Sequence, residues 1–486
     1  ARLAARPNWT AADLARRIAD TGNRLDWLEL GDRGVRATVA ESHAGLTADQ
    51  RALFRRLGML DMPEFPSWLP AALVECAPGR ADRLLDDLVE AHLVEPSGQG
   101  AEGPRYRMHD LVRSAAGELA EAEEAPENLR AVRRRVRHGW LALAAAADAR
   151  LPHWYGLDPA PGPEWTPPEY ALAAARADPM GWFDEERDAL LAVVRGADRA
   201  GCPDTVWPLV QHLSTYLDMR GRYDDWAELL VVGLRAADES GDLQGRATML
   251  GLLMLVQANR DDHGGGLSYA KQAMAAYRSV AENGGAPQHP LGPGPGRRSA
   301  PPPPSNGGGP DHVAAGFAAA RLALSGRAAG EDHDYPALFE RARRAFRSGG
   351  IPLLEVWALK HVALVHCRRH RFVAAQECLD RGAEILDALG DTAAPAYQGG
   401  DLAGVAVAYG RLDLAEEMAE EALAMAKGTG NAWSTGRALL SLSQVREARG
   451  DSRAAAEAYT EALEVWRRLG APRRVEQVRR ALAAHL

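Results

Sequence analysis

The chain has 486 residues, with 57 lysine and arginine residues against 66 acidic residues and a formal net charge of −9. An acidic chain has no general electrostatic attraction for nucleic acid or for an anionic membrane surface. Its length exceeds what one compact core organises, so we expect roughly two to four structural units. The four cysteines form no CxxC pair, which argues against a disulfide scaffold or zinc ribbon and favours a reducing, cytoplasmic location.

Two further classes of protein are excluded by local patterns. The longest apolar stretch, about residues 250–256, is far shorter than the ~18 residues that a membrane-spanning helix needs. A phosphate-binding loop of the form GxxxxGK[ST] requires a lysine directly after a glycine. Lys271, Lys360 and Lys427 are the only lysines, and each follows alanine or leucine. We therefore expect no P-loop and no enzymatic activity in this chain.

The chain begins with a predicted helical segment, residues 1–40. It opens at Ala1 rather than methionine and shows no secretory signal pattern, so we expect a fragment of a longer protein.

Residues 41–115 show the pattern of a winged-helix module. An amphipathic helix is predicted over 46–60 with Thr47 as its N-cap, and two more helices are predicted over 66–75 and 79–95. A turn-rich segment then indicates a β-hairpin. Three helices followed by a hairpin are the winged-helix order.

The third of these helices is unsuited to reading DNA. Between residues 79 and 91 it carries Arg80 and Arg83 against four carboxylates, which oppose the approach of phosphates. The expected wing adds Arg105 and Arg107 as a modest counterweight. A structural or switching role is therefore favoured, and direct DNA binding stays an alternative.

The segment RYRMHDLVR, residues 105–113, is the most specific local signal. It places His109 and Asp110 after the wing strand and at the start of a helix. An imidazole at a helix N-terminus is able to donate a hydrogen bond to a phosphate oxygen, and the partial positive charge of the helix end adds to the attraction. Taken alone, the pattern favours a surface histidine over a phosphate-binding one.

Beyond the winged helix we expect a helical connecting arm over 116–205 and repeats over 206–283 and 313–486. Three C-terminal stretches, beginning at His370, Gly410 and Gly450, align without gaps at a period of 40 residues. They share small residues where paired helices approach closely, and a helix–turn–helix order. The pattern resembles tetratricopeptide (TPR) repeats, with a pitch longer than the usual ~34 residues.

The repeats are interrupted by residues 284–312. Nine prolines and eight glycines occupy positions 284–310. Such a segment cannot bury enough apolar surface to offset its ordering entropy, so a disordered insertion is predicted.

A group of histidines in the repeats has one feature of a metal site. His366 and His370 have the i, i+4 spacing of a metal-binding pair on a helix. They occupy ordinary repeat positions, so we expect exposed histidines and no metal.

The order of winged helix, Met-His-Asp triplet, arm and repeats resembles the C-terminal portion of STAND-class NB-ARC ATPases, and especially the AfsR/SARP-type transcriptional regulators of actinomycetes. Residues 1–18 resemble the helix that follows this family's GLPLA-type segment. Residues 182–194 resemble its W-x-x-x-E-R-x-x-L-x-x-x-V signature. The resemblance covers nearly the whole chain apart from the insertion, whereas the family's P-loop, Walker B acid and DNA-binding domain have no counterpart here.

In that family the histidine of the triplet contacts the β-phosphate of bound ADP and holds the off state. The resemblance implies this role for His109, with Asp110 orienting it or bracing the winged helix against the nucleotide domain. It implies ADP or ATP as the cofactor of a parent protein, with an incomplete site in this chain and no metal.

We therefore predict an all-α fold in which a winged-helix module precedes an α-α superhelix of TPR-like repeats. The predicted function is the regulatory and sensing half of a STAND-type transcriptional regulator. Its repeats would bind a protein, peptide or small-molecule ligand, and activation would involve homo-oligomerisation. DNA and RNA polymerase would be contacted only through domains absent from the chain, and no membrane is involved. The alternatives are a TPR interaction scaffold without nucleotide control, or DNA binding by the winged helix.

Overall fold

The structure is a computed structural model that describes residues 39–260 and 335–483, apart from 40, 61, 63, 152–159, 349–351, 390–392, 409 and 470, together with scattered positions between 265 and 279. The predictions for 1–38 and 284–312, and those parts of the predicted repeats that fall within 261–283 and 313–334, lie wholly or partly outside the described residues. The chain separates into two compact units, Ala1–Arg150 with Gly162–Ala200, and Leu151–Pro161 with Gly201–Leu486. Each unit is described by itself.

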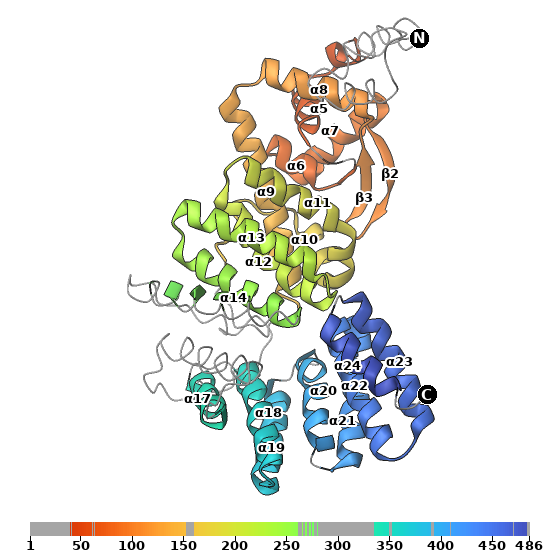
Figure 1. Cartoon of the computed structure of the whole chain (residues 1–486). Coiled ribbons are helices and arrows are strands. Elements are labelled where there is room, and N and C mark those ends of the chain that lie inside the picture. The colour runs from red at the N-terminus through yellow and green to blue at the C-terminus, as the bar shows by residue number, and fades with distance from the viewer. Residues whose placement is uncertain are drawn as a thin grey trace, which may run out of the picture. The chain divides into compact units, whose positions relative to one another are not determined.

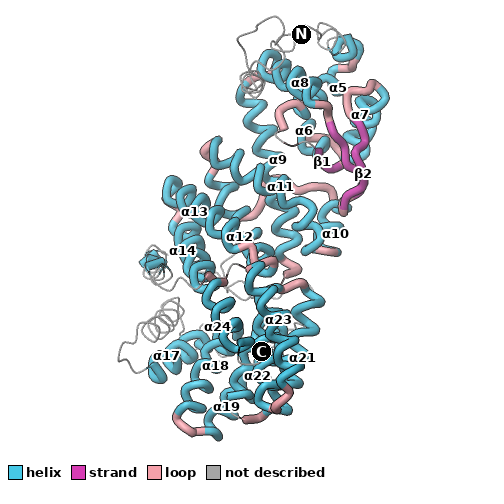
Figure 2. The backbone as a smooth tube through the Cα atoms, turned by 45° about the vertical axis from the view of Figure 1, so that its right-hand side comes forward, coloured by secondary structure: helices cyan, strands magenta, loops and turns pink. Residues whose placement is uncertain are grey.

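The first unit contains the predicted winged-helix module. Its elements follow in the order α5 (Ala48–Leu57), β1 (Glu64–Pro66), α6 (Leu69–Val74), α7 (Pro78–Glu90), β2 (Glu95–Gly100) and β3 (Gly103–Arg107). The three strands form an antiparallel sheet in the order β1-β3-β2, drawn in magenta in Figure 2. The predicted hairpin is confirmed. The short strand β1 was missed, because three residues carry too little alternation to be recognised.

Helix α5 begins where the sequence indicates. The hydroxyl of Thr47 accepts a hydrogen bond from the backbone N–H of Gln50 at 3.4 Å, and the Gln50 side chain accepts one from the Thr47 N–H at 2.7 Å. This reciprocal pair is a capping box, which satisfies two N–H groups at the helix start. The apolar face of the helix buries Leu53, Phe54 and Leu57 completely or nearly so.

Helix α7 is shorter than predicted. It ends at Glu90, and the following turn places His92 in the left-handed conformation with φ of 57°. That turn directs Leu93 and Val94 back into the core, where both are buried. The expected extension of the helix to residue 95 is therefore wrong.

Four arm helices complete the first unit: α8 (Asp110–Glu123), α9 (Pro126–Asp148), α10 (Glu169–Ala177) and α11 (Pro179–Arg199). Figure 1 shows α9 running between α6 and the pair α10 and α11. Three tryptophan rings connect the winged helix with the arm helices. The ring centroids of Trp68 and Trp140 are 5.2 Å apart, and those of Trp140 and Trp182 are 6.5 Å apart. All three rings are fully buried, so the arm and the winged helix share one core.

The second unit consists of paired helices. They are α12 (Pro203–Met219), α13 (Tyr223–Ser240), α14 (Leu243–Asn259), α17 (Tyr335–Ser348), α18 (Pro352–Arg368), α19 (Phe372–Leu389), α20 (Ala393–Ala408), α21 (Leu412–Thr429), α22 (Ala432–Ala448), α23 (Ser452–Arg468) and α24 (Pro472–Ala483). Helices α19, α21 and α23 begin at residues 372, 412 and 452, which confirms the predicted period of 40 residues. The described part of the chain is thus mostly helical, with one small sheet.

Small residues mediate the repeat packing as the sequence indicated. Ala375, Ala415 and Ala455 occupy equivalent positions and are fully buried. The turns end helices with glycines of positive φ, among them Gly221, Gly241, Gly410, Gly430 and Gly450. A left-handed residue after a helix pairs its N–H with the last free carbonyls, and glycine adopts that conformation without strain.

Two turns that are distant in sequence meet inside the second unit. The turn after α12 places Gly221 directly against the side chain of Leu469 at the end of α23. Beside it, the ring of Tyr223 stands edge-on to that of Trp433 on α22, with centroids 5.9 Å apart. The α12–α13 pair therefore contacts α22 and the end of α23.

Candidate functional site

His109 lies between the wing and the arm. It follows β3 and the buried Met108, and it is the N-cap of α8 with extended backbone angles (φ −56°, ψ 138°). Its Nδ1 atom accepts a hydrogen bond of 3.3 Å from the backbone N–H of Leu111, while the ring is exposed. The structure thus places the histidine at the start of a helix, as the sequence predicted.

The N-cap bond fixes which ring nitrogen is available. Because Nδ1 of His109 acts as an acceptor, the proton of the neutral ring belongs on Nε2. That Nε2–H group is a hydrogen-bond donor at the N-terminus of α8, where the first backbone N–H groups of the helix carry partial positive charge. The arrangement suits an anionic acceptor supplied from outside the described residues.

Asp110 is bound by Arg113 and not by His109. Its carboxylate accepts a hydrogen bond of 2.9 Å from Nη2 of Arg113, one turn further along α8. The other terminal nitrogen of Arg113 donates to the carbonyl of Met62, between α5 and β1, at 2.9 Å. Arg113 therefore links Asp110, at the start of α8, to the segment between α5 and β1.

A second group of polar residues joins the wing to α11, and we call it the wing–arm cluster: Glu102, Arg105, Trp182, Glu185 and Glu186. The indole Nε1 of Trp182 donates a 2.5 Å hydrogen bond to Oε1 of Glu102 at the tip of the wing. Arg105 of β3 donates to both oxygens of Glu186 and, at 3.3 Å, to Glu185. The N–H of Ala101 donates to Glu185 at 2.9 Å.

Burial sets the protonation of this cluster. The side chains of Glu102 and Glu186 are 7% and 1% exposed. Burial, and next the charge of Glu186, raises the pKa of Glu102 to about 8. Burial also raises the pKa of Glu186 against the opposing hydrogen bond from Arg105. Burial lowers the pKa of Arg105, but Glu186 and the other carboxylates outweigh it and raise that pKa above its ordinary value.

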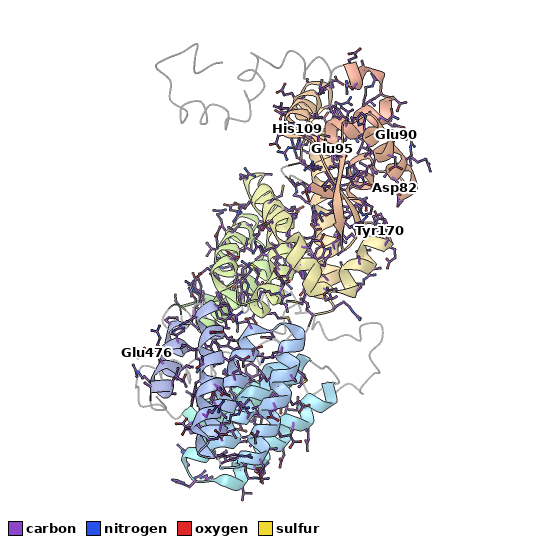
Figure 3. All side chains as sticks on the ribbon, turned by 90° about the vertical axis from the view of Figure 1, so that its right-hand side faces the viewer. Asp82, Glu90, Glu95, His109, Tyr170 and Glu476 are labelled. Atoms are coloured by element: carbon purple, nitrogen blue, oxygen red, sulfur yellow. The ribbon has the colours of Figure 1, made fainter. Side chains whose placement is uncertain are left out.

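The outer face of α7 is acidic. Figure 3 labels Asp82 and Glu90 on one side of the winged-helix module and His109 on the other. Burial, and next the neighbouring charge of Asp86, raises the pKa of Asp82. The two arginines of the wing are already paired, because Arg105 binds Glu186 and Arg107 binds Glu95 at 3.0 Å. Both wing arginines are thus paired with carboxylates of the first unit.

The histidines of the repeats do not form the pair that the spacing indicated. Helix α18 ends at Arg368, and His370 lies beyond it in the turn with φ of 57°. His366 and His370 therefore share no helix face, which corrects that expectation. His361 stacks on Phe339, with ring centroids 4.6 Å apart. Within the described part of the chain, no group of three His, Cys, Asp or Glu side chains is arranged to hold a metal ion.

The sequence signalled only part of the wing–arm cluster. Residues 182–194 stood out as a signature, and the structure shows Trp182 and Glu186 from it bound to the wing. Leu190 and Val194 of the same segment are fully buried. The partners Glu102 and Arg105 lie about eighty residues earlier. No local pattern reveals a pairing over such a distance.

Comparison with known sequences finds partial similarity to a class of bacterial regulators. The chain is 38% identical over 206 residues to the regulatory protein AfsR of Streptomyces griseus, which is 42% of this chain and 20% of that protein. It is 36% identical over 204 residues to AfsR of Streptomyces coelicolor, or 40% and 19% of the two chains. The matched region is thus about a fifth of the length of these relatives. No protein-family model matches the chain.

Comparison with solved structures finds distant helical proteins. A STAND protein with a tetratricopeptide repeat sensor from Pyrococcus horikoshii matches with a TM-score of 0.42 and 13% identity, over 91% of this chain and 64% of that one. A Rap protein in complex with the Competence and Sporulation Factor matches with a TM-score of 0.36 and 12% identity, over 78% and 94%. Among the described residues, no helix is long and apolar enough to cross a membrane.

Proposed function

We propose that the chain is the regulatory and sensing portion of a STAND-type transcriptional regulator of the AfsR kind. The similarity to two Streptomyces regulatory proteins supports this class. The observation that carries the proposal is the position of His109, which caps α8 between the wing and the arm through Nδ1 and has an exposed ring. We place the chain in the cytoplasm.

His109 holds the off state by binding ADP of the complete protein. The nucleotide supplies an anionic β-phosphate oxygen, and the Nε2–H of His109 donates to it. The N-terminus of α8 favours the same negative charge. Asp110 and Arg113 keep the start of α8 in place against the winged helix. A hydrogen bond to a charged group contributes about 1.5–3 kcal/mol, so it shifts the balance between closed and open states by about ten- to a hundredfold.

The TPR-like repeats act as the sensor. Stacked helix pairs build extended concave surfaces that suit a peptide, a protein or a small ligand. Ligand binding changes the balance between the closed and open states, and the open state assembles into homo-oligomers. DNA and RNA polymerase are bound by other parts of the complete protein.

The complete reading frame provides the first test. It is expected to encode a GxxxxGK[ST] segment roughly 200 residues before Ala1. Absence of any such segment favours the alternative, an interaction scaffold without nucleotide control.

The second test replaces His109 in the complete protein. His109→Ala is expected to lower ADP retention by about ten- to a hundredfold and to raise oligomerisation without ligand. His92→Asn is the control, because His92 is an exposed histidine of the same module and asparagine tolerates its left-handed backbone. If His109→Ala leaves ADP retention unchanged and instead lowers the melting temperature of this chain by many degrees, His109 is a structural residue.

A further inference from the structure

We propose that the wing–arm cluster is a proton-dependent latch, in which one proton on Glu102 holds the tip of the wing against α11 and loss of that proton releases it. The inference concerns the first unit alone and is independent of the nucleotide. It assigns a role to Trp182 and Glu186 of the segment 182–194, which bind Glu102 and Arg105 of the wing.

The charge balance of the cluster requires a proton. Glu102 and Glu186 are both buried, and the one guanidinium among them belongs to Arg105. With both carboxyls ionised, the buried group would carry an uncompensated negative charge, which burial strongly disfavours. One proton makes the buried group neutral.

The hydrogen bonds assign that proton to Glu102. Glu186 accepts from two nitrogens of Arg105, which stabilises its ionised form. Glu102 accepts at Oε1 from the neutral indole of Trp182, and its other near donor is the neutral indole of Trp68, while its Oε2 is buried without a geometrically good hydrogen bond. Neutral indoles stabilise a carboxylate less than the guanidinium of Arg105 does, so Glu102 is the carboxyl that keeps its proton, in accord with its raised pKa of about 8.

Glu102 lies near charged, titratable and hydrogen-bonding groups from several elements of the first unit. Glu186 approaches from α11 and Arg105 from β3, and the indole of Trp68 faces it from the turn before α6. Tyr170 on α10 also senses its charge, and burial raises the pKa of that phenol. Ionisation of Glu102 therefore adds negative charge to a site that already contains the ionised Glu186.

The wing tip is held through side chains, so it is able to leave without unfolding the arm. Trp182 packs on Trp140 and Phe183 inside the arm core, with ring centroids 6.5 and 5.1 Å away, and stays there. Glu102 is the side chain that withdraws when its proton passes to solvent water. Release exposes the ionised Glu102 to water at the tip of the wing.

The sign of the pH dependence follows from the raised pKa of Glu102. In the latched state Glu102 keeps its proton up to about pH 8. In the released state its pKa is that of an ordinary glutamate, so it loses the proton at about pH 4.5. The latch is therefore fully stable below about pH 4.5 and weakens as the pH rises toward about 8. Between these limits the equilibrium constant for opening increases by up to about tenfold per pH unit.

Hydrogen exchange of this chain tests the latch. The Ala101 amide, which donates to Glu185, reports on the tip. After correction for the intrinsic exchange rate, its protection is expected to fall by up to about tenfold per pH unit between pH 6 and pH 8. Glu102→Gln, a neutral isostere, is expected to keep high protection with no slope. Glu64→Gln is the matched control, because Glu64 lies 3.9 Å from Arg105 but is 44% exposed, and its variant should keep the wild-type slope.

Two results would overturn the proposal. One is a flat profile in the wild-type chain, which needs no variant and so remains decisive if Glu102→Gln fails to fold. The other is an unchanged slope in a folded Glu102→Gln variant, which would show that a different group titrates.

Discussion

Gly58 and Gly117 face each other where α5 meets α8, so closely that a Cβ atom on Gly58 would collide with the backbone N of Gly117. A Cβ on Gly117 would in turn lie 3.0 Å from the carbonyl oxygen of Gly58. Two helices approach this closely only through residues without side chains. The crossing fixes α8 on the winged helix, and thereby the position of His109 at its start.

Gly58→Ala is expected to destabilise the first unit by about 3 kcal/mol, because the added methyl meets backbone atoms that cannot rotate away. The measurement is thermal or urea unfolding of the chain. Gly196→Ala is the control, since Gly196 lies within α11 with no atom near its missing Cβ. That variant should gain about 0.5–1 kcal/mol from helix propensity. Equal effects of the two substitutions would contradict the close crossing.

Gly221→Ala and Gly241→Ala separate backbone strain from contact between repeats. Both glycines end repeat helices with nearly the same φ, 66° and 68°, so each alanine pays the same left-handed penalty of about 1 kcal/mol. A Cβ on Gly221 would also displace Leu469, whereas Gly241 faces open space. We expect Gly221→Ala to cost about 1–3 kcal/mol more in unfolding free energy. Equal losses would show that the two turns do not meet in solution.

Purified chain is expected not to hydrolyse ATP. Lys360 is buried within α18, and Lys427 pairs with Glu461 at 2.7 Å. Neither follows a glycine-rich loop, and the remaining lysine, Lys271, follows alanine. Phosphate release should therefore equal that of a buffer blank. Turnover that co-elutes with the protein through successive columns would contradict the prediction.

The features that the sequence revealed are local or periodic. The capping box at Thr47, the hairpin and the 40-residue period are visible because residues a few positions apart, or at fixed intervals, carry the signal. The position of His109 was predicted for the same reason, since strand and helix patterns adjoin there. The partners of Arg105 were not predicted, because tertiary packing alone brings α11 to the wing. The sequence reading treated Arg105 as a free basic group, whereas the structure shows it bound to Glu186.

The last prediction is that the chain shows no salt-sensitive binding to duplex DNA. Non-specific binding needs unpaired cations near the phosphates, and it reaches Kd values of about 10⁻⁴–10⁻⁶ M in basic proteins. Here the wing arginines are paired, and the outer face of α7 presents Asp82, Asp86 and Glu90. Anisotropy of a labelled duplex with about 1 µM chain should therefore stay flat from low to physiological salt.

A charge-neutralised variant sharpens that experiment. Replacing the three carboxylates together, Asp82→Asn, Asp86→Asn and Glu90→Gln, removes the repulsion without adding cations. If repulsion at α7 is the barrier, this variant should bind weakly at low salt, with affinity that falls as salt is added. Steep salt-dependent binding by the unmodified chain would mean that the winged helix contacts the phosphate backbone after all. In that case the pairs that hold Arg105 and Arg107 would have to open when DNA binds.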